Sequence, residues 1–473
     1  MRVRENALPV RETAAYRRHS NPNQKGTFEM QINPSRPRLS VTTGGKGVVS
    51  HAGARLLVDL ADDLGLTENL SVAMAPTKTR RRGHDRGEVL VNLAVALADG
   101  ATSISDVRVL ADQPGLFGQV ASVPTTWRTL EAMDDTTLER VAGARAEGRK
   151  AAWAAGMDPG FYVIDIDGTL VDAHSEKELA TPTYKRGFGF YPLMAYLDAT
   201  GEALAGMLRQ GNAGSGTAED HIVVLDAALR QLPVDPNSDE VILRTDAGGT
   251  SHALAEACRA RGVRFVGGVP LRTKVAKTIM AIAKNRWMRG ISADGSDERD
   301  TGEVAEITDL VDMRRWPDGM RMLVRREEPH PGAQLTFTDV EGYRFQVFVT
   351  DLEGPDICFM EALYRGRGRC ECRIRDTKDT GLAHLPSASF AINTAWLTTV
   401  LIASDLLAWT KGLCLEGELA RAEPKRLRYT LLHSAGVLVR SARCTTLRIA
   451  ENWPWANDLV DAFARLPGWA TVT

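Results

Sequence analysis

The sequence predicts a mixed α/β fold that follows a helical N-terminal region. Two changes of pattern along the 473 residues lead to this prediction. From Ser50 to Gly65, and again from Arg86 to Asp99, apolar residues recur at helical spacing. From Phe161 to Pro270, short apolar runs typical of strands alternate with helical stretches. We therefore expect a group of helices first and then a sheet covered by helices.

The overall composition is that of a soluble globular protein long enough for roughly three domains. Hydrophobic residues make up 44% of the chain and charged residues 25%. No apolar run is expected to reach the length of a membrane span, and the N-terminus lacks the apolar segment of a signal peptide. We therefore expect a cytoplasmic protein without a membrane partner. Of the six cysteines only Cys370 and Cys372 are close together, which favours reduced thiols over a zinc site.

Basic residues are concentrated in three blocks, although the 58 basic and 60 acidic residues nearly cancel. The first block is TKTRRRGHDR, from Thr77 to Arg86. The second comprises Arg365, Arg367, Arg369, Arg373, Arg375 and Lys378, and the third Lys425, Arg426, Arg428, Arg440, Arg443 and Arg448. A run of charges is most often a solvated face, but three blocks in a neutral protein favour DNA as a partner.

The N-terminal part divides into a polar tail and a helical domain. Residues 1–45 are rich in Arg, Pro and Asn and lack periodicity, so we expect them to be disordered. Helices are predicted within residues 46–155, which carry the first basic block. Small helical domains of this kind often bind DNA, which makes 46–155 a candidate DNA-binding domain.

A pair of acids ends the first predicted strand, FYVIDIDGTLVDAH, which runs from Phe161 to His174. Strand side chains alternate between faces, so Asp165 and Asp167 point to the same side and need a cation beside them. Three interpretations remain open at this point. Asp165 could be the nucleophile of a haloacid-dehalogenase-type phosphohydrolase, Asp167 could be a metal ligand of a ribonuclease-H-like enzyme, or both acids could be solvated at a strand end.

The order of elements after this strand favours the second interpretation. Residues 187–198 and 203–210 are predicted as two further strands of an antiparallel meander, and a helix follows from about Ser215 to Gln231. A strand that ends at Asp246, a helix and a strand over 263–270 complete the order of a ribonuclease-H-like core within 156–271. In that topology the first and fourth strands are neighbours, so Asp167 and Asp246 would meet.

Residues 272–352 break this pattern and predict a mostly β insertion, before the core resumes in 353–473 with C-terminal helices. Strand-like runs are LVRR, QLTFTDV and YRFQVFVTD, with turns at Asp318-Gly319 and Glu341-Gly342. The insertion contains Trp287 and Trp316, for which a place in the core is the plain interpretation.

A third acid lies in LYRGRGRCECRIRDTKDTGL, from Leu363 to Leu382. On a helix of about 100° per residue, Tyr364, Arg367, Glu371 and Lys378 fall within about 60° of one another. The plain alternative is a solvent-facing face of salt bridges.

This spacing of Tyr, Arg, Glu and Lys resembles the signature of DDE transposases of bacterial insertion sequences. The resemblance extends from about Lys46 to Trp469 and includes VIDIDGTLV, KRGFGFYPL, LRQGNAG, ILRTDAGG, RREEPHPGAQL, KDTGL and EPKRLRYTLLHSAG. It implies a catalytic, metal-binding triad of Asp167, Asp246 and Glu371, with Asp165 as a possible alternative ligand. Three such carboxylates can hold two Mg²⁺ ions about 4 Å apart, with Mn²⁺ as a substitute.

The resemblance also implies a function and partners. Tyr364, Arg367 and Lys378 would hold DNA phosphates. By the same resemblance, Trp287 or Trp316 could stack on a flipped base. The expected activity is cut-and-paste transposition, in which a homodimer on double-stranded DNA cleaves terminal inverted repeats and joins 3′ ends to a target. The alternatives are the phosphohydrolase and a catalytically inactive DNA-binding relative.

Overall fold

The computed structural model describes residues 40–78, 82–173, 176–292, 295–329, 339–340, 342–441 and 444–468. Two compact units divide the chain, Met1–Gly45 and Lys46–Thr473. The predicted disordered tail falls mostly outside the described residues, as do Gln334–Thr338 of the predicted strand QLTFTDV.

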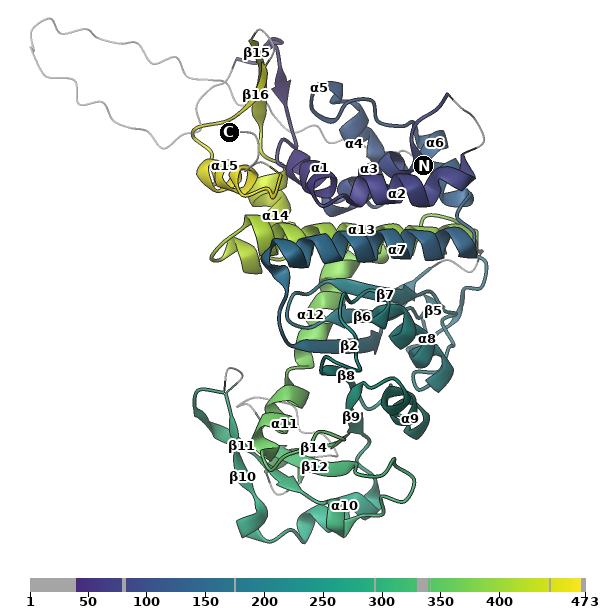
Figure 1. Cartoon of the computed structure of the whole chain (residues 1–473), viewed down its shortest axis with the longest axis vertical. Coiled ribbons are helices and arrows are strands. Elements are labelled where there is room, and N and C mark those ends of the chain that lie inside the picture. The colour runs from purple at the N-terminus through teal and green to yellow at the C-terminus, as the bar shows by residue number, and fades with distance from the viewer. Residues whose placement is uncertain are drawn as a thin grey trace, which may run out of the picture. The chain divides into compact units, whose positions relative to one another are not determined.

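The second unit is built on one large mixed sheet whose centre has the predicted ribonuclease-H-like order (Figure 1). The five central strands follow one another as β7-β6-β2-β8-β9. Strand β2 pairs antiparallel with β6 and parallel with β8, while β9 runs parallel to β8 and β7 antiparallel to β6. Their bounds are Tyr162–Gly168 (β2), Leu193–Leu197 (β6), Ala203–Met207 (β7), Val241–Thr245 (β8) and Arg264–Val269 (β9). The predicted fold class is therefore confirmed.

One predicted strand is in fact two. Residues 187–198 were expected to form a single strand, but the chain breaks between β5 (Phe188–Phe190) and β6. Pro192 lies at the break and has no backbone N–H to donate to a ladder. As a result β5 joins β3 (Val171–Asp172) and β4 (Thr181–Pro182) in a separate small sheet, and only β6 stays beside β2.

The predicted β insertion continues the core sheet and does not form a separate one. Strand β14 (Tyr343–Thr350) pairs antiparallel with β9, and the order then runs through β12 (Arg321–Glu327), β11 (Glu298–Glu306) and β10 (Met288–Ile291). Strands β12 and β14 lie where LVRR and YRFQVFVTD predicted them. The exposed, polar strands β10 and β11 were not predicted, because their residues do not alternate in hydrophobicity.

Helices pack on the core sheet and place the third acid. Helix α8 (Ala218–Leu229) contacts β6 and β7, and α9 (His252–Ala260) contacts β9. Helix α11 (Ile357–Arg365) lies against β10 and β11, and α12 (Gly368–Thr377) lies against β2 and β6. Further helices among the described residues after the core strands are α10 (Thr273–Met280), α13 (Phe390–Trp409), α14 (Pro424–Leu427) and α15 (Ala456–Ala464).

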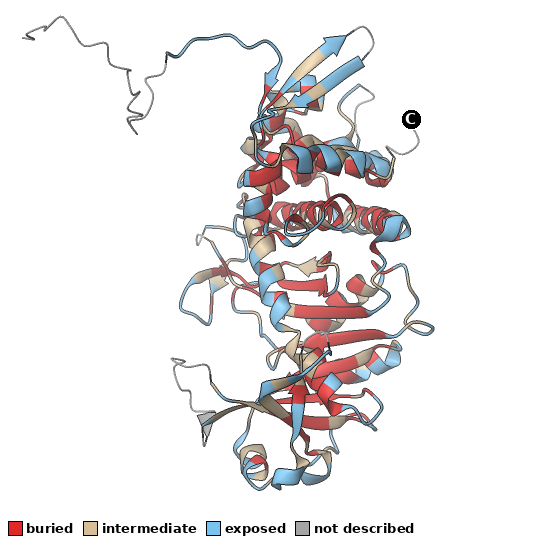
Figure 2. Ribbon diagram, turned by 90° about the vertical axis from the view of Figure 1, so that its left-hand side faces the viewer, coloured by how far each residue is buried: buried red, intermediate tan, exposed pale blue. Residues whose placement is uncertain are grey.

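The N-terminal helices share one hydrophobic core with the sheet. They are α1 (Ala54–Asp63), α2 (Leu66–Met74), α3 (Arg86–Ala98), α4 (Arg108–Ala111), α5 (Pro114–Phe117), α6 (Val123–Glu131) and α7 (Asp135–Ala152). Helices α3, α6 and α7 contact α13 (Phe390–Trp409), which packs on β7. Buried residues accordingly fill both the long-helix layer and the sheet (Figure 2). Strand β1 (Val48–Val49) even pairs with β15 (Gly436–Ser441), which pairs with β16 (Cys444–Ile449) near the C-terminus.

The expectation that no apolar run reaches membrane-span length is wrong for α13. Together with the turn that follows it to Cys414, this helix is long and apolar enough to cross a membrane by length and composition. In the structure, 72% of its most apolar stretch is buried inside the protein. Its buried acid Asp405 accepts hydrogen bonds from arginines of α7. The helix is a core helix of this fold.

A buried ionic network ties α7 and α13 to the turn between β6 and β7. Arg145 donates to Asp405 at 2.8 Å, and Arg149 donates to Asp405 at 2.8 Å and to Glu202 at 3.0 Å. The side chains of Arg149, Glu202 and Asp405 are completely buried. Glu202 also accepts from the indole N–H groups of Trp153 and Trp409. Each charge is therefore paired, which is the condition for burying it.

We expect Asp405→Ala to lower the free energy of unfolding by about 3–5 kcal/mol, because it leaves Arg145 and Arg149 short of a buried counter-charge. Urea denaturation followed by circular dichroism measures the change. Glu418→Ala is the matched control, since it removes an exposed carboxylate paired with Arg426 and should cost less than about 1 kcal/mol. Equal effects of the two substitutions would contradict the role given to the network.

Candidate active site

The three predicted acids come from two neighbouring strand ends and one helix. Asp167 is next to last in β2, Asp246 directly follows β8, and Glu371 lies in the first turn of α12. Ile166 of β2 is in register with Thr245 of β8, so the next residues, Asp167 and Asp246, leave the sheet side by side. This is the neighbouring position expected from the topology.

A single guanidinium joins all three acids. Arg367 Nη2 lies 2.7 Å from Asp167 Oδ2 and 4.0 Å from Asp246 Oδ2, and Arg367 Nη1 lies 3.6 Å from Glu371 Oε1. The three carboxylates therefore converge around one cationic group beside the carboxyl ends of the central strands β2 and β8. Oxygen donors gathered in this way also suit a hard divalent cation such as Mg²⁺.

The carboxylates differ in exposure and in electrostatics. The Glu371 side chain is 71% exposed, Asp246 38% and Asp167 15%. Burial raises the pKa of Asp167 to about 6, with the charges of Asp246 and Glu371 adding to the shift and Arg367 opposing it. Burial lowers the pKa of Arg367, but Asp167 and Asp246 outweigh it and the net shift is upward. The Asp167 carboxyl thus binds a proton more tightly than an ordinary aspartate does, even with Arg367 beside it.

Asp165 lies inside the sheet and is not part of this group. Both of its oxygens accept hydrogen bonds from Arg244 of β8, each at 2.6 Å, and the residue is only 1% exposed. Burial raises the pKa of Asp165 to about 6, against the effect of Arg244. A buried carboxylate held at both oxygens is poorly placed to attack a phosphate ester, as the phosphohydrolase interpretation requires.

Arg244 holds the end of α11, the helix that precedes Arg367 and Glu371 in the chain, and the sequence did not reveal this role. Besides Asp165, its guanidinium contacts Asp198 at 3.2 Å and donates to the backbone oxygen of Leu363 in α11 at 2.6 Å. The signal was an arginine inside the apolar run VILRT, in a strand expected beside the one with Asp165. A buried arginine opposite a buried acid on a neighbouring strand is an ion pair.

The loop after Asp246 holds the carboxylate in place. The backbone N–H of Gly249 donates to Asp246 Oδ1 at 2.6 Å. A Cβ on Gly249 would lie 2.8 Å from Nε2 of His221, a buried residue of α8. Burial lowers the pKa of His221, which keeps the imidazole neutral beside Asp246. The Ala247-Gly248-Gly249 segment therefore needs glycine to let His221 and the Asp246 loop approach each other.

The four residues of the predicted helical face do not lie on one continuous helix. Gly366 and Arg367 separate α11 from α12. Tyr364 is partly buried and stacks on Phe348, with ring centroids 4.6 Å apart. Lys378 donates to the backbone oxygen of Leu170 at 2.8 Å, and burial lowers its pKa. Of the predicted DNA-binding residues, Arg367 contacts all three acids, and Tyr364 lies near Asp246.

The two tryptophans of the insertion pack against other side chains of the protein. Trp287 lies under the guanidinium of Arg326, which is 4.1 Å from the ring centroid. Trp316 packs against His252, with ring centroids 4.3 Å apart. Both side chains are partly buried against the main hydrophobic core.

Most of the second basic block is paired within the protein. Arg365, Arg369 and Arg375 form ion pairs with Glu361, Asp198 and Glu423, and Arg367 contacts the three acids. In the third block, Lys425 and Arg426 pair with Asp379 and Glu418. Arg440 and Arg448 are exposed, and Arg443 lies outside the described residues. Because of these pairings, the first basic block is the better candidate for a surface that binds an anion.

Comparison with known proteins bears on the whole chain. Residues 33–470 match the family model for the transposase DDE domain, group 1. No curated protein matches the chain. A solved structure with some similarity is the piggyBac transposase synaptic complex with hairpin DNA, which is 13% identical and covers 80% of each chain at a TM-score of 0.35. That score is too low to support an argument about this protein. The family model, in contrast, matches most of the chain, and the matched range contains Asp167, Asp246 and Glu371. The chain therefore belongs to the DDE transposase family.

Proposed function

We propose that this protein is a cut-and-paste DNA transposase that binds the terminal inverted repeats of an insertion sequence, cleaves them, and joins the freed 3′ ends to target DNA. The observation that carries the proposal is the convergence of Asp167, Asp246 and Glu371 around one cationic group. Acids gathered from two strands and a helix, at a partly exposed sheet edge, are suited to metal-dependent phosphoryl transfer. A homodimer bound to paired DNA ends is part of the proposal.

Asp167, Asp246 and Glu371 would hold Mg²⁺, with Mn²⁺ as a substitute. Bound there, the metal lowers the pKa of a water or a DNA 3′-hydroxyl and stabilises the leaving oxygen at phosphorus. Gly249 N–H orients the Asp246 carboxylate, and Arg244 holds α11, the helix that directly precedes the one with Glu371. Arg367 lies beside the acids and can donate two parallel hydrogen bonds to a DNA phosphate.

A basic hollow in the helical part suits the DNA backbone. It has a volume of about 270 Å³ and is lined by Lys78, Arg82, Gly83, His84, Arg86, Thr125, Arg128 and Thr129. Among the described residues, no acidic side chain lines it. Burial lowers the pKa of Arg86 and the nearby charge of Arg128 adds to the shift, which shows that these cations repel each other. A phosphate between them would relieve that repulsion.

We expect Asp167→Asn, Asp246→Asn and Glu371→Gln each to lower the rate of DNA cleavage by about 100-fold or more, because each removes one metal-binding carboxylate. The assay uses Mg²⁺ and duplexes from the DNA that flanks the gene, chosen for inverted repeats. Glu418→Gln is the control for loss of an exposed acid. Hydrolysis of small phosphate esters that depends on Asp165 would overturn the proposal.

Metal binding should weaken as the pH falls through about 6. Asp167 has a pKa of about 6 in the folded protein, so below that pH a proton competes with the cation, at up to about tenfold per pH unit. Isothermal titration with Mg²⁺ between about pH 5 and about pH 8 measures this. Mg²⁺ prefers oxygen ligands, so histidines elsewhere do not contribute.

The raised pKa of Asp167 also makes the stability of the metal-free protein depend on pH. The folded state binds this proton more tightly than the unfolded chain, whose value is near 3.8, so this group destabilises the fold as the pH rises from about 4 to about 6. Asp167→Asn should remove that dependence along with most of the Mg²⁺ affinity. A Mg²⁺ affinity independent of pH across this range would contradict the assignment.

Arg82→Ala and Arg128→Ala should each weaken DNA binding uniformly across sequences and lower the salt slope of log K by about 1. Fluorescence anisotropy at several salt concentrations measures both quantities. Arg314→Ala is the matched control, because its side chain is 89% exposed and paired with Asp312 elsewhere on the surface. The same loss in the control and the hollow variants would show that total charge, and not the hollow, holds the DNA.

A further inference from the structure

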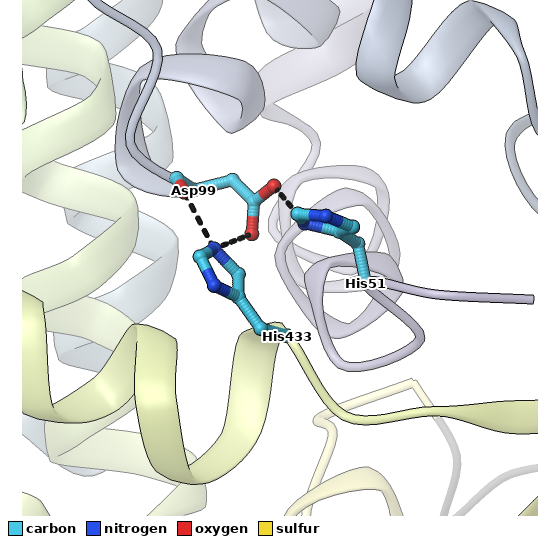
Figure 3. A group of neighbouring side chains, drawn as sticks. All are labelled: His51, Asp99 and His433. Atoms are coloured by element: carbon cyan, nitrogen blue, oxygen red, sulfur yellow. Dashed lines mark hydrogen bonds and ion pairs between the residues drawn. The ribbon is translucent and has the colours of Figure 1, made fainter. Parts of the chain in front are cut away.

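Three residues far apart in the sequence, His51, Asp99 and His433, lie close together in the structure (Figure 3). His51 lies between β1 and α1, Asp99 directly follows α3, and His433 follows the helical turn Arg428–Leu432. None of them belongs to the triad or to the basic hollow.

Their polar atoms point toward one another. His51 Nδ1 lies 2.6 Å from Asp99 Oδ2, and His433 Nε2 lies 3.3 Å from Asp99 Oδ1 and 2.8 Å from the Asp99 backbone oxygen. One ligand atom of each side chain lies within 4.8 Å of the other two. Zn²⁺ binds such nitrogen and oxygen atoms at about 2.0–2.2 Å, which places neighbouring ligand atoms about 3.3 Å apart. The two separations from Asp99, 2.6 Å and 3.3 Å, lie at or below that value, and all three ligand atoms lie within 4.8 Å of one another, so adjustments of the side chains would bring them to bonding distance of one ion.

The carboxylate at the centre lacks full compensation. Asp99 is 6% exposed, and apart from the 3.3 Å ion-pair contact with His433 Nε2 its Oδ1 has no hydrogen bond of good geometry among the described residues. The nearby cation Arg428 donates to the backbone oxygens of Ala98 and Asp379 and not to this carboxylate. A buried carboxylate oxygen without a hydrogen bond is costly, and a bound cation would satisfy it.

We infer that His51, Asp99 and His433 form a binding site for a transition-metal ion of the Zn²⁺ class. Two imidazoles and one carboxylate favour such a metal over Mg²⁺, which prefers oxygen ligands. The His51 and His433 side chains are 25% and 42% exposed, so an ion can enter from solvent and keep a water as a further ligand.

The metal would act as a clamp between distant parts of the chain. Residues 51 and 433 flank the pairing of β1 with β15, and Ala52 N–H donates to the backbone oxygen of Ser434 at 2.9 Å. Asp99 adds the end of α3, which packs on the core helix α13. A bound ion would hold the three-stranded sheet β1-β15-β16 against the helical part.

The test uses the full chain with the triad neutralised by Asp167→Asn, Asp246→Asn and Glu371→Gln. The exposed thiols are removed by Cys372→Ser and Cys444→Ser, because they could bind zinc on their own. We expect isothermal titration of the metal-free protein with Zn²⁺ to show one ion per chain and a higher Tm on binding. Co²⁺ should give visible absorption bands of a site with nitrogen and oxygen ligands.

His51→Gln and His433→Gln should each weaken Zn²⁺ binding by at least about tenfold, whereas His384→Gln, at an exposed position, should leave it unchanged. Folding of each variant is checked against the metal-free parent by circular dichroism. Absence of Zn²⁺ binding in the parent, or binding that both cluster variants retain, would overturn the inference and leave a hydrogen-bonded cluster without metal. DNA cleavage by the unmodified chain is measured separately, so failure of either proposal is recognised independently of the other.

Discussion

The arrangement of the site depends on one electrostatic constraint: three carboxylates meet at the edge of a sheet and repel one another. Two like charges 4 Å apart cost about 1 kcal/mol in water and about 4 kcal/mol at the effective dielectric constant of a protein surface. Arg367 offsets this repulsion, because its guanidinium reaches all three acids. Burial is the main cause of the raised pKa of Asp167, and the charges of Asp246 and Glu371 add to it. A place that needs positive charge in this way is also a place where a divalent cation binds well.

That constraint can be met only because other charges hold the surrounding elements in position. Arg244 joins β8 to Asp165 of β2 and to the backbone of α11, and so sets the position from which Arg367 and Glu371 reach the strand ends. Further away, the buried network around Asp405 holds α7 and α13 against the turn between β6 and β7. The same residue type thus serves two purposes: arginines that are fully paired and buried fix the frame, and Arg367, partly exposed, stays beside the reactive acids.

The continuous core has a consequence for how DNA binding and catalysis are related. The helices that carry the basic hollow contact α13, and α13 packs on β7 of the catalytic sheet. A helical region that shares its core with the sheet keeps the proposed DNA-binding hollow at a fixed position relative to the three acids, which a flexible linker would not. Pairing of β1 with β15 adds a second connection between early and late parts of the chain.

Local pattern was enough to locate the strands β2, β8 and β9 and the helices α3, α8 and α9, whereas the triad of Asp167, Asp246 and Glu371 was chosen from the family resemblance. Alternating and helical spacing depend on neighbouring residues alone, and the strand-end position of Asp167 and Asp246 can be read from them. What only the tertiary structure decided were pairings between residues far apart: Arg244 with Asp165, His221 with the Asp246 loop, and Asp99 with His51 and His433. The sequence likewise could not show that the insertion extends the core sheet, or that α13, apolar enough for a membrane, is a core helix held through Asp405. Such contacts depend on which surfaces meet after the chain has folded, and no local spacing encodes that.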